Sequence, residues 1–282
     1  MTTYTHQTAP TQFVEVSGIK FAYRRFGKKE GIPVVLNMHF TGTMDHWDPA
    51  VTDGLATERE VIIFNQAGIS STSGETPESI YEMAWQEEAF IDALGLGQID
   101  LLGFSMGGLV AQQIVLDRPE LVRKLILAGT GPKGGEGMQS LTPEAQGIFG
   151  ATYETPGDLW LKVHFSPTEK SQALGRKFLE RTALRTIDRD PLSKDSVAGA
   201  QIKALAGYNV ITGDRYSDLK KIKQPTLVIN GSNDVIIYTI NSYILQQNLP
   251  DATLVLFPDS NHGSLFQYPE EFVGYVNSFL NQ

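Results

Sequence analysis

Residues 99–116 read IDLLGFSMGGLVAQQIVL, and this stretch decides the fold. It starts with a short apolar run over 99–102, which is typical of a buried strand, and then turns sharply through GFSMG at 103–107. The apolar residues that follow recur at helical spacing. A Gly-x-Ser-x-Gly motif between a strand and a helix puts the serine at the apex of a strained turn, where its hydroxyl can act as a nucleophile. We therefore predict that Ser105 is a catalytic nucleophile; the alternative is an ordinary glycine-rich turn.

Other apolar runs on both sides of this stretch predict a parallel sheet. Residues 12–16 and 19–25 alternate around a Ser-Gly pair and predict an antiparallel hairpin at its edge. Continuous apolar runs predict further buried strands at 33–39, 61–64, 125–128, 226–230 and 253–257. Helical patterns separate them at 49–57, 78–94, 238–249 and 269–280. The expected fold class is α/β, with a mostly parallel eight-stranded sheet and helices on both faces. Residues 1–11 are expected to form a mobile tail.

One long segment interrupts the alternation of strands and helices. Residues 132–222 contain no buried-strand pattern, but helical patterns occur near 143–149, 157–165, 167–185 and 193–208. We interpret this segment as a helical cap inserted over the carboxyl edge of the sheet, where open α/β sheets bind their ligands. Residues 1–131 and 223–282 would then form the core. The alternative is a structural insertion without a role in substrate binding.

A serine hydroxyl needs a base and an acid to become nucleophilic at neutral pH. His262 follows the last predicted strand and precedes the terminal helix, so it can reach back over the sheet edge; otherwise it caps that helix. Asp234 lies in a turn just after the strand at 226–230, where its carboxylate can orient an imidazole. Turn formation or helix capping is the competing role of Asp234. Asp259 is a weaker alternative for the acid because it lies only three residues from His262.

Composition excludes several classes of function. The 282 residues carry a net charge of −9 and no basic stripe, so neither nucleic acid nor an anionic membrane is expected as a partner. The chain has no cysteine, which excludes disulfides, a thiol nucleophile and thiolate metal sites and fits a cytoplasmic location. The five histidines are scattered without metal-ligand spacing, so no metal and no cofactor are predicted. We expect a small-molecule substrate, and a homodimer is left open.

Together these motifs resemble the α/β-hydrolase superfamily over nearly the whole chain. The resemblance rests on the elbow GFSMGG, the acid turn NGSNDV, the histidine loop SNHG and His39 at a strand end, in the chain order Ser…Asp…His. It implies the fold and a Ser105–His262–Asp234 triad. The serine at position 105 separates the chain from haloalkane dehalogenases and epoxide hydrolases, which have aspartate there. The loops look most like the haloperoxidase and esterase branch.

The resemblance also implies an oxyanion hole made of two backbone N–H groups. Met106 would supply one, at a helix N-terminus. Relatives usually read His-Gly-x in the loop that supplies the other, but this chain reads His39-Phe40-Thr41-Gly42, so the donor is Phe40, which we favour slightly, or Thr41. The loop NQAGIS at 65–70 lacks the acid and the arginine of the family pattern, which we interpret as a rewired structural loop.

Aromatic residues of the predicted cap indicate an apolar substrate pocket. Phe40, Thr41 and Trp160 are our candidate substrate-binding residues. Other residues that could line the pocket, or merely join the cap to the core, are Trp47, Phe149, Tyr153, Leu161 and Phe165. No cluster of Arg or Lys marks a carboxylate or phosphate site, so an uncharged ester or lactone is expected.

Three functions fit these residues. The first is a serine hydrolase that acts through an acyl-enzyme. The second uses the same triad for perhydrolysis, with haloperoxidase-like activity, or for acyl transfer. The third is a ligand-binding receptor with an idle triad.

Overall fold

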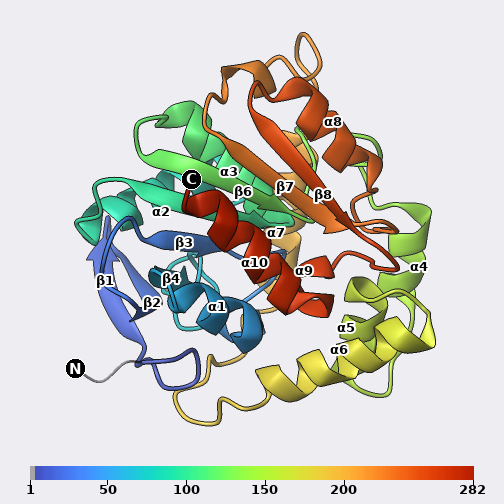
Figure 1. Cartoon of the computed structure of the whole chain (residues 1–282), viewed down its shortest axis with the longest axis horizontal. Coiled ribbons are helices and arrows are strands. Elements are labelled where there is room, and N and C mark those ends of the chain that lie inside the picture. The colour runs from blue at the N-terminus through green and yellow to red at the C-terminus, as the bar shows by residue number, and fades with distance from the viewer. Residues whose placement is uncertain (1–3) are drawn as a thin grey trace.

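A single sheet organises the computed structural model, which describes residues 4–282. Its strands are β1 (Gln12–Val16), β2 (Ile19–Gly27), β3 (Val34–Asn37), β4 (Glu60–Phe64), β5 (Ile99–Phe104), β6 (Val122–Ala128), β7 (Thr226–Gly231) and β8 (Ala252–Phe257). They are ordered β1-β2-β4-β3-β5-β6-β7-β8. β2 runs antiparallel to both β1 and β4, and the other neighbours pair in parallel (Figure 1). The predicted α/β fold with a mostly parallel eight-stranded sheet is confirmed.

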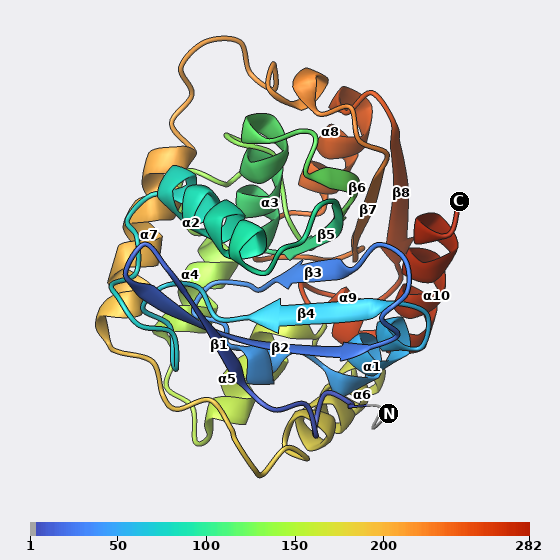
Figure 2. The ribbon, with the colours of Figure 1, turned by 90° about the vertical axis from the view of Figure 1, so that its left-hand side faces the viewer.

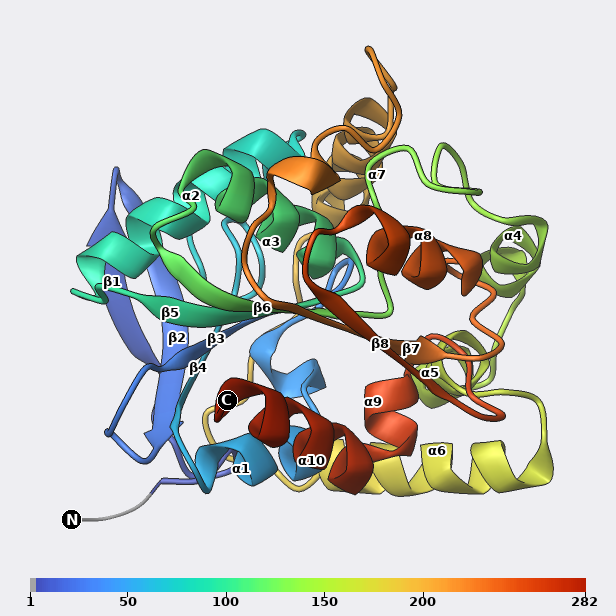
Figure 3. The same cartoon turned by 45° about the horizontal axis from the view of Figure 1, so that its top comes forward.

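Helices cover both faces of this sheet. In Figure 3, α2 (Ile80–Ala93), α3 (Met106–Asp117) and α8 (Ile240–Asn248) lie above it, whereas α1 (Pro49–Ala56) and α10 (Pro269–Leu280) lie below it. Three short elements were not predicted: helix α9 (Ser264–Gln267) and 3-10 turns at Met44–His46 and Leu219–Lys221. They escape prediction because one helical turn is too short to show a hydrophobic period.

The central strands send alternate side chains into two separate cores. Val35 and Leu101 belong to the core under α2 and α3. Leu36 and Leu102, one residue further along each strand, belong to the core under α1 and α10. All four side chains are fully buried, because a parallel sheet covered on both faces leaves its central strands no solvent-exposed side. This explains why the strands read as unbroken apolar runs.

Between β6 and β7 the chain forms the helices α4 (Pro143–Gly150), α5 (Pro156–His164), α6 (Glu169–Thr182) and α7 (Ser196–Tyr208). α5 and α6 pack on the core of α1 and α10, to which Phe178 belongs. α7 packs on the other core and lies beside α2 (Figure 2). The insertion therefore contacts both faces of the molecule. Its division from the core at 132 and 222 stays a prediction.

The prediction of a mobile N-terminal tail is wrong for the described part, residues 4–11. His6 and Ala9 are buried. The guanidinium of Arg185, from the insertion, donates hydrogen bonds to the carbonyls of His6, Gln7 and Ala9 at 2.8–2.9 Å. A buried arginine requires several acceptors, and the polar tail supplies them. Residues 1–3 of the predicted tail lie outside the described residues.

The described chain contains no helix with the length and apolar character needed to cross a membrane.

Candidate active site

The turn between β5 and α3 holds Ser105 in a strained conformation. Its backbone lies at φ 57° and ψ −122°, in the left-handed half of backbone space that side chains rarely adopt. The Ser105 amide donates to the Ala128 carbonyl of β6 at 2.9 Å, and the Gly108 amide closes the turn on the Ser105 carbonyl at 2.9 Å. A Cβ at Gly107 would lie 2.3 Å from the Asn37 carbonyl oxygen, so only glycine allows helix and strand to approach this closely.

Ser105, His262 and Asp234 are brought into one hydrogen-bonded line. The His262 Nε2 atom lies 2.8 Å from Ser105 Oγ, and its Nδ1 atom lies 2.9 Å from Asp234 Oδ2. The other carboxylate oxygen of Asp234 accepts the amides of Ile236 and Ile237. An ionised carboxylate only accepts hydrogen bonds, so Nδ1 carries the ring hydrogen. Nε2 is then unprotonated and can accept the serine proton. All three side chains are buried.

The weaker candidate for the acid lies elsewhere. Asp259 uses its carboxylate to accept the hydroxyl of Thr168 at 2.7 Å. It therefore joins the histidine loop to the start of α6. Among the described residues it makes no hydrogen bond to His262, which binds Asp234 instead.

Two backbone amides beside this line have no hydrogen-bond acceptor among the described residues. One belongs to Met106, the first residue of α3, and the other to Phe40. The next two amides of the loop are occupied, because Thr41 donates to Gln201 Oε1 at 2.6 Å and Gly42 donates to the His39 carbonyl at 2.9 Å. In the loop between β3 and α1, the geometry thus favours Phe40 over Thr41 as the available donor. Because the first amides of a helix lack internal partners, Met106 is a suitable second donor.

Aromatic rings and neutral imidazoles lie against His262 or against the rings that contact it. The His164 ring stacks on His262 with centroids 5.8 Å apart and planes 11° apart. Trp160, one turn earlier on α5, lies 5.0 Å from His164, 5.2 Å from His39 and 4.6 Å from His46. Trp160 therefore packs on His164, the ring that stacks on His262, and its role in substrate binding stays a prediction.

Burial keeps these additional imidazoles uncharged at neutral pH. It lowers the pKa of His39 to about 3 and the pKa of His46 to about 4, and it holds the pKa of His164 well below its usual value. Neighbouring imidazoles add to the shift of His39 and His164. The surroundings of His262 are consequently apolar and free of cationic charge from these rings. Although four imidazoles gather here, no group of metal-ligating side chains among residues 4–282 is arranged to hold a metal ion.

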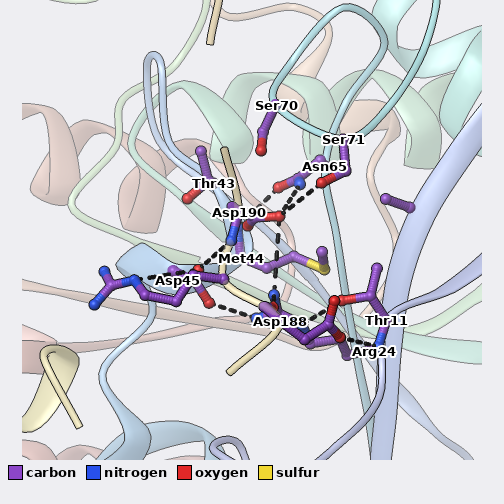
Figure 4. Close-up of polar contacts among 12 residues, drawn as sticks. Thr11, Arg24, Thr43, Met44, Asp45, Asn65, Ser70, Ser71, Asp188 and Asp190 are labelled. Carbon is purple, nitrogen blue, oxygen red and sulfur yellow. Dashed lines mark hydrogen bonds and ion pairs between the residues drawn. The ribbon is translucent and has the colours of Figure 1, made fainter. Parts of the chain in front are cut away.

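Behind the loop of residues 39–48 lies a buried charged cluster, shown in Figure 4. Arg24 of β2 pairs with Asp45 of the loop at 2.5 Å, and Asp45 also accepts the backbone amide of Asp190 at 2.6 Å. Asn65 donates to the Asp190 carboxylate at 2.9 Å and accepts the Met44 amide at 2.8 Å. The cluster therefore joins the sheet, the loop and the return segment of the insertion.

This cluster accounts for the altered loop at 65–70. The family pattern has an acid where this chain has Asn65, and here a carboxylate reaches the same place from Asp190, far along the sequence. Burial, followed by the nearby Asp45, raises the pKa of Asp190, and Arg24 opposes that rise. The carboxylate beside Asn65 therefore comes from a segment 125 residues further along the chain.

The remaining residues that were predicted to line the pocket differ in how far their side chains are exposed. Phe165 is buried against Phe178, Trp47 is fully buried, and Leu161 packs on the same core. Phe149 is 42% exposed, and Tyr153 donates its hydroxyl to the Ile148 carbonyl within α4. A cavity of about 300 Å³ lies behind α3, lined among others by Gln112, Tyr208 and Tyr216, and no triad residue lines it.

Sequence reasoning missed His164, His46 and Gln201. Gln201 is fully buried on α7 and reaches the loop of residues 39–48. One signal could have found it: Val197, Ala204 and Tyr208 lie at helical spacing from it, so the carboxamide stands on the apolar face. His164 similarly lies one turn after Trp160.

Comparisons with known proteins agree with the fold. A family model described as "alpha/beta hydrolase fold" matches residues 32–269. The pimeloyl-[acyl-carrier protein] methyl ester esterase of Nitrosomonas europaea is 31% identical over 186 residues, which make up 63% of this chain and 69% of that protein. An alpha/beta hydrolase fold protein from Chitinophaga pinensis has a TM-score of 0.93 and 38% identity, with 99% of this chain and 100% of that chain covered. Est816, described as an N-acyl homoserine lactone degrading enzyme, has a TM-score of 0.74 and 26% identity, with 95% and 100% covered.

Proposed function

Because the chain belongs to the α/β-hydrolase fold family, we propose that it cleaves small or medium-sized uncharged carboxylic esters or lactones through a Ser105 acyl-enzyme. The observation that carries this proposal is the continuous hydrogen-bonded line from Ser105 through His262 to Asp234. An aligned nucleophile, base and orienting acid are the parts that acyl transfer requires.

In the proposed reaction, His262 Nε2 takes the Ser105 proton as the hydroxyl oxygen attacks the carbonyl carbon. The Met106 and Phe40 amides hold the oxyanion that forms, and such preorganised donors stabilise the transition state more than the ground state. His262 then gives its proton to the leaving oxygen. Water, deprotonated by His262, releases the acid and restores Ser105, while Asp234 stays ionised and stabilises the imidazolium.

The surroundings of the triad support an uncharged substrate. The rings that contact His262 are Phe104 and His164, and His164 in turn contacts Trp160 and His39. Burial keeps the imidazoles of His39 and His164 neutral. A substrate carboxylate or phosphate would lose its hydration there without gaining a cationic partner from these rings. The names of two relatives, a methyl ester esterase and a lactone degrading enzyme, point to the same two substrate classes.

Activity-based labelling and ester hydrolysis test the proposal. We expect a fluorophosphonate probe to label wild-type protein at Ser105 and expect hydrolysis of p-nitrophenyl butyrate. Ser105→Ala should abolish labelling and lower kcat by roughly 10⁴–10⁶-fold, as loss of a triad nucleophile does elsewhere. Ser140→Ala, which changes an exposed serine, is the matched control and should behave as wild type. Wild-type protein that takes up no probe and turns over no ester would instead favour a ligand-binding receptor.

A further inference from the structure

One helix of the insertion presents a carboxamide to the loop of residues 39–48. The buried residues of α7 are Val197, Gln201, Ala204 and Tyr208, which share one face of the helix. Gln201 is the only one of the four with an amide side chain, and it is 0% exposed. A buried amide that contributes only packing would be replaced at no cost by an apolar residue, so the contacts of this side chain decide its role.

The two polar atoms of Gln201 are used differently. Oε1 accepts the Thr41 backbone amide at 2.6 Å, across 160 residues of sequence. Nε2 is buried and has no hydrogen-bond partner among the described residues. A carboxamide nitrogen carries two N–H donors, and a buried donor left unpaired is costly unless a ligand or a water satisfies it.

The hydrogen bond to Gln201 Oε1 holds the peptide between Phe40 and Thr41, to which the Thr41 amide belongs. Thr41 has φ 56°, a conformation that a residue with a Cβ adopts only when its surroundings impose it. Gln201 occupies the Thr41 amide, whereas the neighbouring Phe40 amide has no acceptor among the described residues.

Two imidazole nitrogens near His262 share this lack of a hydrogen-bond partner. His39 Nε2 and His164 Nδ1 are also buried without a hydrogen-bond partner among residues 4–282. Their rings lie 5.5 Å apart, and His164 stacks on His262. The neutral His39 ring donates from Nδ1 to the Phe40 carbonyl, so its Nε2 is an acceptor, whereas Gln201 Nε2 carries N–H donors. A buried donor without a partner indicates that the bound molecule brings an acceptor oxygen in addition to its scissile carbonyl.

We propose that Gln201 is a positioning and specificity-determining residue, which orients the Phe40 amide through Oε1 and donates from Nε2 to a second oxygen on the acyl side of the substrate. This rests on the proposed hydrolase function and names its substrate class more narrowly: esters or lactones with an ether, keto or hydroxyl oxygen near the reacting carbonyl.

A pair of isosteric esters tests the donor role. p-Nitrophenyl methoxyacetate differs from p-nitrophenyl butyrate by an oxygen in place of one CH₂ group. Gln201→Met keeps the length of the side chain but removes both polar atoms. The ratio of kcat/KM for methoxyacetate over butyrate should fall about 10-fold in this variant, which is the loss expected for one hydrogen bond to a buried donor. The different chemical reactivity of the two esters cancels, because the same pair is compared in both proteins.

The split between kcat and KM tests the positioning role. Gln201→Met should lower kcat for butyrate by about 10–100-fold, less than complete loss of an oxyanion donor, with KM changed by less than about 3-fold. The inhibition constant of a trifluoromethyl ketone, which forms the oxyanion, should rise by the same factor as kcat falls. Lys203→Met, at an exposed position of the same helix, is the matched control and should match wild type.

Each part can fail separately from the proposed function. An unchanged ester ratio would overturn the donor role, and an unchanged kcat for butyrate would overturn the positioning role. If Gln201→Met does not fold, Gln201→Asn, one methylene shorter, takes its place with the same expectations. If wild-type protein hydrolyses neither ester, the proposed function fails. The inference is then judged by fluorophosphonate labelling, which Gln201→Met should slow about 10-fold because the phosphonyl oxygen needs the same donors.

Discussion

The two amides proposed to hold the oxyanion belong to regions that are fixed in opposite ways. Each follows or precedes a non-glycine residue in the left-handed region, Ser105 at φ 57° and Thr41 at φ 56°. The elbow around Ser105 is fixed by its own sequence, through β5, α3 and glycines that let them touch. The loop of residues 39–48 is fixed from outside, by groups that lie more than a hundred residues away: the side chains of Gln201 and Arg181 and the backbone amide of Asp190.

The external supports of the loop come largely from the insertion. Gln201 accepts the Thr41 amide, the Asp190 amide binds Asp45, and Arg181 binds Asp48 in a two-point ion pair at 2.5 and 2.8 Å. The elbow pairs its amides with its own turn and with the adjacent strand β6, whereas an irregular loop must satisfy its buried polar groups with whatever packs against it. The insertion therefore helps to hold this loop in place.

The largest effect is expected from closing the space at the elbow. In Gly107→Ala the new Cβ would lie 2.3 Å from the Asn37 carbonyl oxygen and 2.6 Å from its carbon, which are backbone atoms that cannot turn aside. We expect the free energy of unfolding to fall by about 3 kcal/mol, as in overpacked cores, and kcat to fall at least about 100-fold because the Met106 donor is the adjacent residue. Chemical denaturation and p-nitrophenyl butyrate kinetics measure both.

The control for this change lies on α7. A Cβ at Gly199 meets nothing within 4 Å, so Gly199→Ala should stabilise the helix by about 0.5–1 kcal/mol and leave kcat unchanged. Equal behaviour of the two alanine variants would refute the view that the elbow is sterically closed.

A smaller effect is expected from releasing the loop at its far end. The Asp48 carboxylate is fully buried and caps α1, so Arg181→Met leaves it without its cationic partner. We expect the free energy of unfolding to fall by about 3 kcal/mol, at the lower end for broken buried pairs because the Arg181 side chain is 27% exposed. The displaced loop should lower kcat about 10-fold, in line with a modest misplacement of one oxyanion donor.

Arg176→Met makes the same substitution at an exposed position of α6 and should change neither quantity. If Arg181→Met were as stable and as active as this control, the loop would not depend on the insertion at Asp48.

The smallest effect is expected on the pH dependence of stability, through the buried imidazole of His6. Burial, with a further contribution from Arg24, lowers the pKa of His6 from 6.5 to about 3. The unfolded chain therefore binds a proton between pH 6.5 and pH 3 that the folded chain refuses, and stability falls as the pH falls through this window. His6→Gln should reduce the slope of unfolding free energy against pH by up to about 1.4 kcal/mol per pH unit between pH 6 and 4.

Urea unfolding at several pH values gives this slope. Tyr4→Phe, at a 43% exposed position of the same segment, retains His6 and should keep the wild-type slope. Identical slopes for His6→Gln and wild type would mean that the imidazole titrates normally in the folded protein.

Local pattern was enough to predict most of the architecture. Every predicted strand and helix from residue 12 onward is present, with ends that differ by a few residues. The prediction works because buried strands and amphipathic helices each have a characteristic spacing of apolar residues. Ser105, His262 and Asp234 were each recognised from a motif or from a place just after a strand. The structure brings these three residues together, and their catalytic role stays a prediction.

The contacts that complete the site could not be read in the same way. His164 and Gln201 look like ordinary members of helices, and Asp190 lies in an irregular segment. Gln201 and Asp190 have partners 125–160 residues away, and His164 stacks on His262, also far along the chain, and no local period encodes such contacts. The buried N-terminal segment was missed for the same reason, since Arg185 supplies its partner from the insertion.

The sequence alone determined the α/β fold and the strained turn at Ser105, because hydrophobic period, glycine placement and turn strain act over a few neighbouring residues. Only the tertiary structure decided that Gln201 accepts the Thr41 amide, that the neutral His164 ring stacks on His262, and that Asn65 binds the Asp190 carboxylate. Those outcomes depend on hydrogen bonds and burial, which exist only after distant parts of the chain have packed together.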